Sequence, residues 1–269
     1  MPFSTDKLPP FEPALRVLVA DDNELNQLVV CRALEDWNVE VALADNGRQA
    51  VELATAQTFD AILMDVQMPE MDGYEATRRL RSYPPLLRLP IIGLTASASA
   101  EDQALALAAG MNATLAKPFD PALLHASLAH YTRLSAQAAT QQRETTDPDA
   151  PIDGRIEPDW SILEELASGN EAFIAQIITT FLQQTPALYQ ELVLSSTDSG
   201  SAVQARVAHK LKGQVVYFGV PALQVQLEQL ERPGTSLSAA SSQQLVDSIG
   251  KHLSLLYPQL ESRLQQHSS

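Results

Sequence analysis

Three aspartates in the first half of the chain have the setting of a cation-binding site. Asp21 and Asp22 directly follow one short apolar run, and Asp65 directly follows another. Thr95 ends a further run, and Lys117 follows the last. If these runs are parallel strands, their carboxyl ends meet at one edge of a sheet, so the five side chains converge there. Oxygen ligands with room for water suit Mg²⁺, which would also offset the repulsion among three carboxylates.

This set of side chains could transfer a phosphoryl group. A carboxylate beside bound Mg²⁺ can attack phosphorus and form an acyl phosphate. The metal, the Thr95 hydroxyl and the Lys117 amine would then share the charge on the transferring oxygens. The plainer alternative is a group of solvated acids at strand ends. It accounts for any one of these residues but poorly for all five.

A second candidate site centres on His209. On a helix over 201–218, at about 100° per residue, one side is apolar, and we expect His209 to point nearly opposite it, into solvent. Lys212, three residues further on, could place a positive charge beside a phosphoryl group on the ring. A neutral imidazole is a competent nucleophile near pH 7, because its unperturbed pKa is about 6.5. The apolar side comprises Val203, Val207, Leu211, Val215 and Phe218.

The residues alone leave a simpler interpretation of His209 open, namely an exposed histidine beside an exposed lysine. Gly213 lies one turn away, although glycine inside a helix costs roughly 1 kcal/mol relative to alanine, and it leaves room for the backbone of another protein. For the other four histidines we predict ordinary surface or packing roles. They are His125, His130, His252 and His267.

Five apolar runs would position the aspartates. Stretches with helical spacing, such as 25–37 and 48–56, lie between them. Strands that alternate with helices predict an α/β, doubly wound domain with a five-stranded parallel sheet. The runs are 16–20, 40–44, 60–64, 90–94 and 113–116.

The second half contains no strand-like run. Its amphipathic stretches, separated by short polar breaks with glycine or proline, predict an all-α helical bundle. Residues 135–155 hold one large aliphatic side chain and two prolines, so we predict a linker there, between domains at 14–134 and 156–266. The helical stretches are 160–166, 171–194, 201–218, 221–230 and 241–264.

Composition narrows the classes of function. With 18 basic and 33 acidic residues the net charge is −15, which disfavours binding to nucleic acid. No apolar run approaches the ~20 residues that span a bilayer, and the first residues lack the basic and apolar segments of a signal peptide. The single cysteine, Cys31, excludes an internal disulfide framework. We therefore expect a reduced, cytoplasmic protein without membrane insertion.

Four segments of the first half resemble the signature motifs of response-regulator receiver domains, and the resemblance covers roughly 14–134. It implies that Asp65 accepts a phosphoryl group. It also implies that Asp21 and Asp22 hold Mg²⁺, together with Asp65 and the backbone carbonyl of Gln67. The motifs are VLVADDN at 17–23, ILMDVQMPEMDG at 62–73, IGLTA at 92–96 and LAKPF at 115–119.

The same resemblance assigns the remaining residues of the site. It implies that Thr95 is a switch hydroxyl, and that Lys117 pairs with the phosphate and is joined to Pro118 by a cis peptide. Receivers that switch an output domain usually carry an aromatic residue three positions before this lysine, where this chain has Thr114. The departure favours phosphoryl passage over conformational output.

The second half resembles the histidine phosphotransfer (HPt) domains of multistep phosphorelays over about 157–264. The resemblance implies that His209 is a phosphoacceptor, with Lys212 beside it. The sequence QVV at 214–216 departs from the small polar or alanine-rich residues usual at these positions, which bears on partner preference. The motifs are AHKLKG at 208–213, FG at 218–219 and LEQLE at 227–231.

Together the two resemblances suggest a two-component phosphorelay intermediate. Neither half contains a P-loop or the ATP-binding boxes of a histidine kinase, so we expect a phosphoryl carrier and not an ATP-dependent enzyme. In this hypothesis an upstream histidine kinase phosphorylates Asp65, the group passes to His209, and His209 passes it to a downstream response-regulator receiver. By family resemblance the exposed face of the first receiver helix, 26–37, docks on the His209 helix. The lack of long heptads favours a monomer.

Two alternatives stay open. One is an adaptor or phosphate sink that binds a kinase or regulator and leaves one phosphosite unused. The other is a phosphatase that uses the aspartate site. Hydrolases with an aspartyl nucleophile generally need a second acid two residues later, and this chain has Gln67 there.

Overall fold

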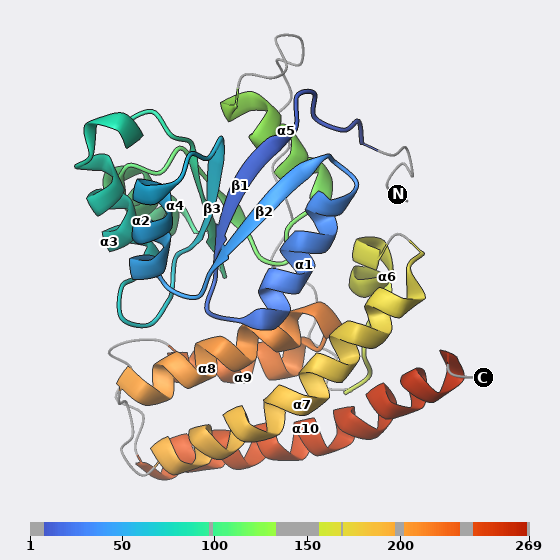
Figure 1. Ribbon diagram of the computed structural model, residues 1–269. Coiled ribbons are helices and arrows are strands. Elements are labelled where there is room, and N and C mark those ends of the chain that lie inside the picture. The colour runs from blue at the N-terminus through green and yellow to red at the C-terminus, as the bar shows by residue number, and fades with distance from the viewer. Residues whose placement is uncertain are drawn as a thin grey trace. The chain divides into compact units, whose positions relative to one another are not determined.

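The computed structural model describes residues 8–96, 99–132, 156–167, 169–196, 202–231 and 239–267 (Figure 1). The chain divides into two compact units, 1–143 and 144–269, and each is described by itself. The predicted linker, 135–155, lies outside the described residues. Within the described part of the chain, no helix combines the length and the hydropathy needed to cross a bilayer.

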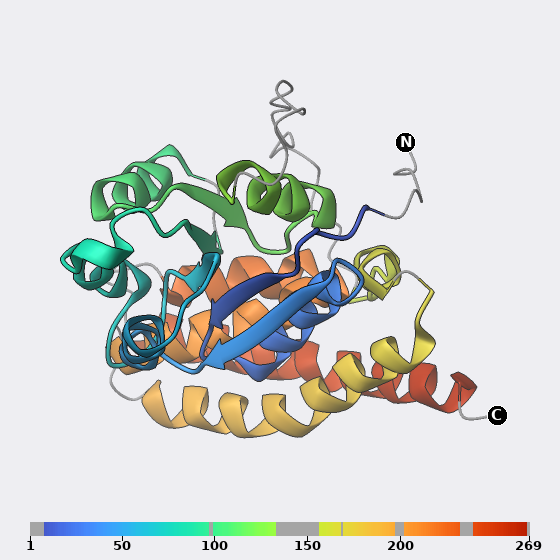
Figure 2. The same ribbon diagram turned by 45° about the horizontal axis from the view of Figure 1, so that its top comes forward.

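The first unit is built on a five-stranded parallel sheet, which confirms the predicted α/β fold (Figure 2). The strand order is β2-β1-β3-β4-β5, so the chain winds outward from β1 in both directions, as in flavodoxin-like folds. β3 and β4 are buried along their whole length, as expected of strands covered on both faces. The strands are β1 (Leu15–Ala20), β2 (Val39–Ala44), β3 (Ala61–Asp65), β4 (Ile91–Thr95) and β5 (Ala113–Ala116).

Helices cover both faces of this sheet. α2, α3 and α4 lie on one face, where their alanine and leucine side chains pack on β1 and β3, and α1 and α5 lie on the other (Figure 1). Asn or Asp side chains cap most of these helices, as Asn23 does for α1 and Asp72 for α3. The helices are α1 (Glu24–Glu35), α2 (Gly47–Ala56), α3 (Gly73–Arg81), α4 (Ala100–Ala109) and α5 (Pro121–Tyr131), with a 3₁₀ turn η1 (Pro84–Leu86).

The described residues of the second unit form helices and their connections, with no strand among them, which confirms the predicted helical bundle. α8 and α9 pack closely side by side, and α7 and α10 complete the bundle. Its core is apolar, with Phe181, Phe218 and Leu256 fully buried. The helices are α6 (Ser161–Ala167), α7 (Glu171–Ser195), α8 (Ala202–Val215), α9 (Pro221–Glu231) and α10 (Ala239–His267), with a 3₁₀ turn η2 (Val216–Phe218).

The helix predicted over 201–218 is shorter than expected. α8 ends at Val215, and the chain continues as η2 to Gly219, which has a φ of 58°. A side chain at Gly219 would also collide with Asp159, whose Cβ lies 2.6 Å from the position of an ideal Cβ. The backbone amide of Asp159 donates to the carbonyl of Phe218 (2.9 Å). The left-handed glycine therefore turns the chain from α8 to α9 and seats the segment before α6.

The apolar face predicted for α8 is wrong at one position. Val203 is 44% exposed, whereas Gln204 and Ala208 are buried. The amide of Gln204 donates to the hydroxyl of Ser242 on α10 (2.8 Å). A polar partner therefore turns this glutamine inward, and the buried face of α8 is rotated away from Val203.

Candidate functional site

The three aspartates singled out from the sequence lie together at the carboxyl edge of the sheet. Asp21 and Asp22 follow β1, and Asp65 is the last residue of β3, not the residue after it. One carboxylate oxygen from each lies within 4.8 Å of the others. Asp21 and Asp65 are buried, and Asp22 is half-buried.

Lys117 joins two of these carboxylates. Its Nζ lies 2.6 Å from Oδ2 of Asp21 and 2.8 Å from Oδ2 of Asp65, and its side chain is almost fully buried. The backbone amide of Lys117 donates to the carbonyl of Thr95 (2.7 Å), so the end of β5 is held to the end of β4. Thr95 is buried at the same edge. The peptide between Lys117 and Pro118 is cis, as the resemblance implies.

The loop after β3 contacts both the carboxylate and the backbone of Asp65. The amide of Gln67 donates to Oδ1 of Asp65 (3.3 Å), and the Gln67 side chain is exposed. The amide of Gly73 donates to the carbonyl of Val66 (2.9 Å). An ideal Cβ on Gly73 would lie 2.1 Å from the carbonyl oxygen of Asp65. The loop can therefore close over the aspartate only because residue 73 has no side chain.

Two amide side chains of α1 also hold Asp21, and sequence reasoning missed them. Asn26 Nδ2 donates to Oδ1 of Asp21 (3.1 Å), beside the backbone amide of Asn23 (2.9 Å). Gln27 Nε2 donates to the Asp21 carbonyl (2.7 Å) and to Oδ1 of Asp45 (3.1 Å). Their positions five and six residues after Asp21 could have indicated this role. Side chains in the first turn of α1 lie close to the end of the strand that precedes it.

The predicted docking face of α1 needs correction at both of its ends. Asn26 is buried because its amide bonds Asp21. Trp37 is buried because its ring packs edge-on against His125, with 4.9 Å between ring centroids. Neither residue can contribute to an exposed surface.

The donor set of the aspartate site fits a hard divalent cation. All three donor groups are carboxylates, and three negative charges face the single positive charge of Lys117. A buried excess of negative charge is costly unless a cation neutralises it. Asp22 is partly exposed, which leaves room for the water ligands that Mg²⁺ usually keeps.

The histidine site differs from the prediction in its exposure. The His209 side chain is 14% exposed, so it does not project into solvent. Its Nδ1 lies 2.5 Å from Oε1 of Glu231, the last residue of α9. Lys212 Nζ donates to the other oxygen, Oε2, of the same carboxylate. The prediction used the spacing of residues on one isolated helix, whereas in the structure α9 packs beside α8 and its Glu231 contacts the ring.

Glu231 is therefore the site residue that sequence reasoning missed on the bundle. Burial alone would raise the pKa of Glu231, but hydrogen bonds and charge from His209 and Lys212 outweigh it and lower the pKa. As a carboxylate, Glu231 accepts a hydrogen bond from His209 when the ring carries a proton on Nδ1. A neutral ring with its proton there has its lone pair on Nε2. The last glutamate of the LEQLE segment was visible in the sequence, but no single-helix pattern shows which helix it faces.

His125 and His252 have packing contacts, in line with the ordinary surface or packing roles predicted for them, whereas the side chain of His267 lies outside the described part of the structure. His125 stacks on Phe11, with 4.6 Å between ring centroids, and contacts the carbonyl of Pro9. His252 Nδ1 lies 3.0 Å from Oε1 of Gln226, and burial lowers the His252 pKa.

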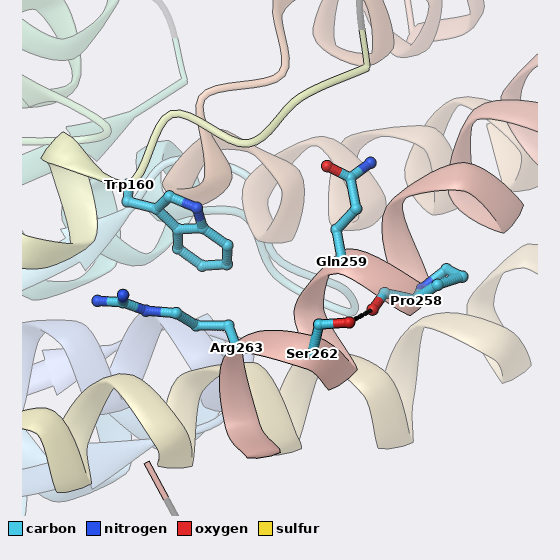
Figure 3. Close-up of a pocket in the computed structure, with 5 residues that line it drawn as sticks. All are labelled: Trp160, Pro258, Gln259, Ser262 and Arg263. Atoms are coloured by element: carbon cyan, nitrogen blue, oxygen red, sulfur yellow. Dashed lines mark hydrogen bonds between the residues drawn. The ribbon is translucent and has the colours of Figure 1, made fainter. Parts of the chain in front are cut away.

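A cavity of about 400 Å³ in the helical unit contains none of the predicted site residues (Figure 3). The Arg263 guanidinium carbon lies 5.4 Å from the ring centroid of Trp160, and Arg263 also pairs with Glu164. Gln259 donates to the carbonyl of Ile156 (2.8 Å), and Ser262 donates to that of Pro258. The contacts of Gln259 and Arg263 hold α6 and the segment before it on α10, which is a structural role.

A groove of about 1050 Å³ lies on the first unit. Its lining includes Asp60, Pro90 and Asn112, which precede β3, β4 and β5. It therefore opens at the end of the strands opposite to the aspartate site.

The sequence model of the response regulator receiver domain matches residues 17–129. Signal transduction histidine-protein kinase BarA of Escherichia coli is 33% identical over 233 residues, which cover 82% of this chain and 24% of BarA. Sensor protein GacS of Pseudomonas syringae is 31% identical over 221 residues, which cover 81% of this chain and 24% of GacS. The chain thus spans about a quarter of the length of these relatives, and no kinase domain is evident in it.

A match over 82% of the chain extends past residue 129, so the similarity to BarA includes part of the helical unit. Among solved structures, the receiver domain of sensor histidine kinase PA1611 from Pseudomonas aeruginosa PAO1 is 42% identical, with a TM-score of 0.43. The match covers 45% of this chain and 98% of that one, which holds a magnesium ion in its active-site cleft. By the match to the receiver-domain model, residues 17–129 belong to the response regulator receiver domains of two-component signalling. With the similarity to BarA, the helical unit that follows is consistent with a histidine phosphotransfer domain.

Proposed function

We propose that the chain is a phosphorelay intermediate that carries a phosphoryl group between Asp65 and His209. In this proposal a receiver domain over 14–134 and an HPt domain over 156–266 flank a linker. An upstream histidine kinase supplies the group, and a downstream response-regulator receiver takes it. The observation that carries the proposal is the contact of Glu231 with both His209 and Lys212, because it prepares the histidine as a nucleophile.

At the receiver site, Asp65 is the phosphoacceptor. Its carboxylate attacks the phosphorus of the donor, and the bond from phosphorus to the leaving group breaks as the new P–O bond forms. Lys117, which contacts Asp65 directly, pairs with the transferred oxygens. Mg²⁺ held by Asp21, Asp22, Asp65 and the Gln67 carbonyl would neutralise charge on those oxygens.

Thr95 is proposed to stabilise the phosphorylated state through its hydroxyl. It is buried at the edge of β4 beside the end of β5. Thr114 lies in β5, where receivers with an output domain usually have an aromatic side chain. With Thr114 at this position, the usual coupling between the threonine hydroxyl and an aromatic ring three positions before the lysine does not operate. The site is therefore suited to passing the group on.

At the bundle site, His209 accepts the group on Nε2. The lone pair on Nε2 attacks the phosphorus of the aspartyl phosphate, the N–P bond forms, and the P–O bond to Asp65 breaks and restores its carboxylate. Glu231 holds the proton on Nδ1 and balances the positive charge that develops on the ring. Lys212, which contacts the same carboxylate as His209, would pair with the phosphoryl oxygens.

Mass spectrometry that preserves acyl and imidazole phosphates tests the proposal. The wild-type chain is incubated with Mg²⁺ and acetyl phosphate, beside Asp65→Ala and His209→Gln. We expect phosphate on Asp65 and on His209 in the wild type, on Asp65 alone in His209→Gln, and on neither residue in Asp65→Ala.

Two results would contradict the proposal in different ways. Phosphate confined to Asp65 in the wild-type chain would exclude internal transfer and favour an adaptor or a phosphate sink. Undiminished phosphate on His209 in Asp65→Ala would contradict the order of transfer.

A further inference from the structure

The helix that carries His209 is attached to its neighbours by amide hydrogen bonds as well as by apolar packing. Gln214 is fully buried. Its Oε1 accepts a hydrogen bond from the hydroxyl of Thr185 on α7 (3.0 Å). Its Nε2 donates to Oε1 of Gln184, also on α7 (2.8 Å). Both polar groups of this amide are therefore satisfied by one helix.

A second buried amide lies at the other end of α8. Gln204 is 1% exposed, and its Nε2 donates to Oγ of Ser242 on α10 (2.8 Å). Ser242 is fully buried. His209 follows Gln204 by five residues and precedes Gln214 by five. α8 is thus attached to two different helices at points on either side of His209.

α9, which carries Glu231, has an equivalent contact. Gln226 lies five residues before Glu231. Its Nε2 donates to Oγ of Ser248 on α10 (2.8 Å), and its Oε1 contacts Nδ1 of His252 on the same helix (3.0 Å). Both helices that form the His209–Glu231 contact are therefore hydrogen-bonded to α10.

Amide contacts constrain a helix in a way that apolar packing does not. Apolar burial is non-directional, whereas an amide hydrogen bond weakens steeply when its distance or angle changes. A buried amide that loses its partner is strongly unfavourable. A buried asparagine fixes the register of a coiled coil by the same means. A rotation of α8 would separate Gln214 from Thr185 and His209 from Glu231 together.

We propose that Gln204 and Gln214 are positioning residues that fix the rotation and axial register of α8. They hold His209 Nδ1 against Glu231, so that Nε2 keeps its lone pair and a constant direction. That this direction of Nε2 serves phosphoryl transfer rests on the proposed function. The positioning itself has an independent readout, which is the tautomer of His209.

Paired apolar replacements in the whole 269-residue chain test this. Thr185→Val with Gln214→Met removes the α7 contact without leaving the buried Thr185 hydroxyl unpaired, so the free energy of unfolding should change little. ¹⁵N NMR of the imidazole, assigned with His209→Gln, measures the fraction of the Nδ1–H tautomer. We expect this fraction to fall, and phosphoryl transfer to His209 to slow by roughly 10- to 100-fold.

Two further variants make the result decisive. Thr185→Ser keeps the hydroxyl and should retain the wild-type tautomer and rate. Gln204→Met with Ser242→Ala removes the α10 contact, and it provides the test if the first pair does not fold. A folded double variant with the wild-type tautomer fraction overturns the proposal. If wild-type His209 accepts no phosphoryl group, the proposed function fails, but the tautomer comparison still decides the positioning role.

Discussion

The two candidate phosphoacceptor sites are electrostatic inverses of each other. In the receiver, one cation contacts two carboxylates, since Lys117 bridges Asp21 and Asp65. In the helical unit, one carboxylate contacts two nitrogen groups, since Glu231 bridges His209 and Lys212. The first arrangement has an excess of negative charge. In the second, the single carboxylate of Glu231 faces the ammonium group of Lys212 and the His209 ring.

This difference shows how each site obtains a charge-balanced state. The receiver site is assembled from strand ends far apart in the sequence, buries its acids, and needs an external cation to be neutral. The bundle site is assembled from two adjacent helices and is balanced by its own glutamate. Metal dependence should therefore reside in one half of the chain alone.

The largest effect is expected on removing the single cation of the receiver site. Lys117→Met leaves two buried carboxylates without the ammonium group that both contact, and breaking a buried ion pair costs about 3–5 kcal/mol. Urea denaturation at pH 7 measures the loss. Lys251→Met, which removes an exposed lysine of α10, is the control, with a change within about 0.5 kcal/mol. Equal effects of the two variants would mean that Lys117 does not hold the acids together.

Mg²⁺ should stabilise the chain through the receiver site only. A ligand that binds the folded state alone, at 100 times its Kd, adds about 2.7 kcal/mol to the free energy of unfolding. We expect this gain in the wild type and in Glu231→Gln, and its loss in Asp65→Ala or after chelation with EDTA. Thermal unfolding across a Mg²⁺ titration measures it. A gain that required Glu231 would break the contrast between the two sites.

A smaller effect is expected from Glu231→Gln. Hydrogen bonds to charged groups contribute about 1.5–3 kcal/mol, and the partial exposure of this site favours the lower value. Because folding lowers the Glu231 pKa, its contribution is present above the ordinary glutamate pKa of about 4.3 and is lost as pH falls through the folded value.

The effect of Glu231→Gln can be tested by its dependence on pH. The stability difference between wild type and Glu231→Gln, followed by urea denaturation, should shrink as pH falls below the ordinary glutamate range. Glu261→Gln, at an exposed position of α10, should show no such difference. If the Glu231→Gln difference did not shrink below the ordinary glutamate pKa, Glu231 would not be the shared anion.

The smallest effect has the opposite sign. Asp22→Asn removes one of three like charges at a half-buried position, so without Mg²⁺ it should raise stability, by less than about 1 kcal/mol. The same variant should lose the Mg²⁺ response. Asp36→Asn, at an exposed position after α1, is the matched control. Destabilisation by Asp22→Asn without metal would show that the receiver acids do not repel one another.

Sequence periodicity predicted the elements closely because each has a strong local signal. The apolar runs at 60–64 and 90–94 are β3 and β4 shifted by one residue, and the helical stretch at 171–194 is α7 without its last residue. The convergence of Asp21, Asp65 and Lys117 followed from the parallel order of the strands. Both depend on rules that act within a segment or between neighbouring strands.

What could not be predicted depends on contacts between helices. The spacing of residues on α8 alone predicted His209 in solvent and Val203 in the core. It took no account of packing by α9 or of the hydroxyl of Ser242. Asn26 was assigned to an exposed face because its bond to Asp21 forms only when α1 starts close behind the strand. Side-chain partners across elements decided each of these positions.

Gly73 contributes no functional group, yet the geometry of the reactive carboxylate depends on it. Since its missing Cβ would overlap the Asp65 carbonyl, any larger residue displaces the main chain of the nucleophile itself. An engineer who redesigned this receiver by varying only its polar ligands would leave that constraint untouched. Under random mutagenesis and selection, substitutions of Gly73 would be eliminated as strictly as substitutions of the aspartates. Glycine nevertheless has no side chain to which a chemical role could be assigned.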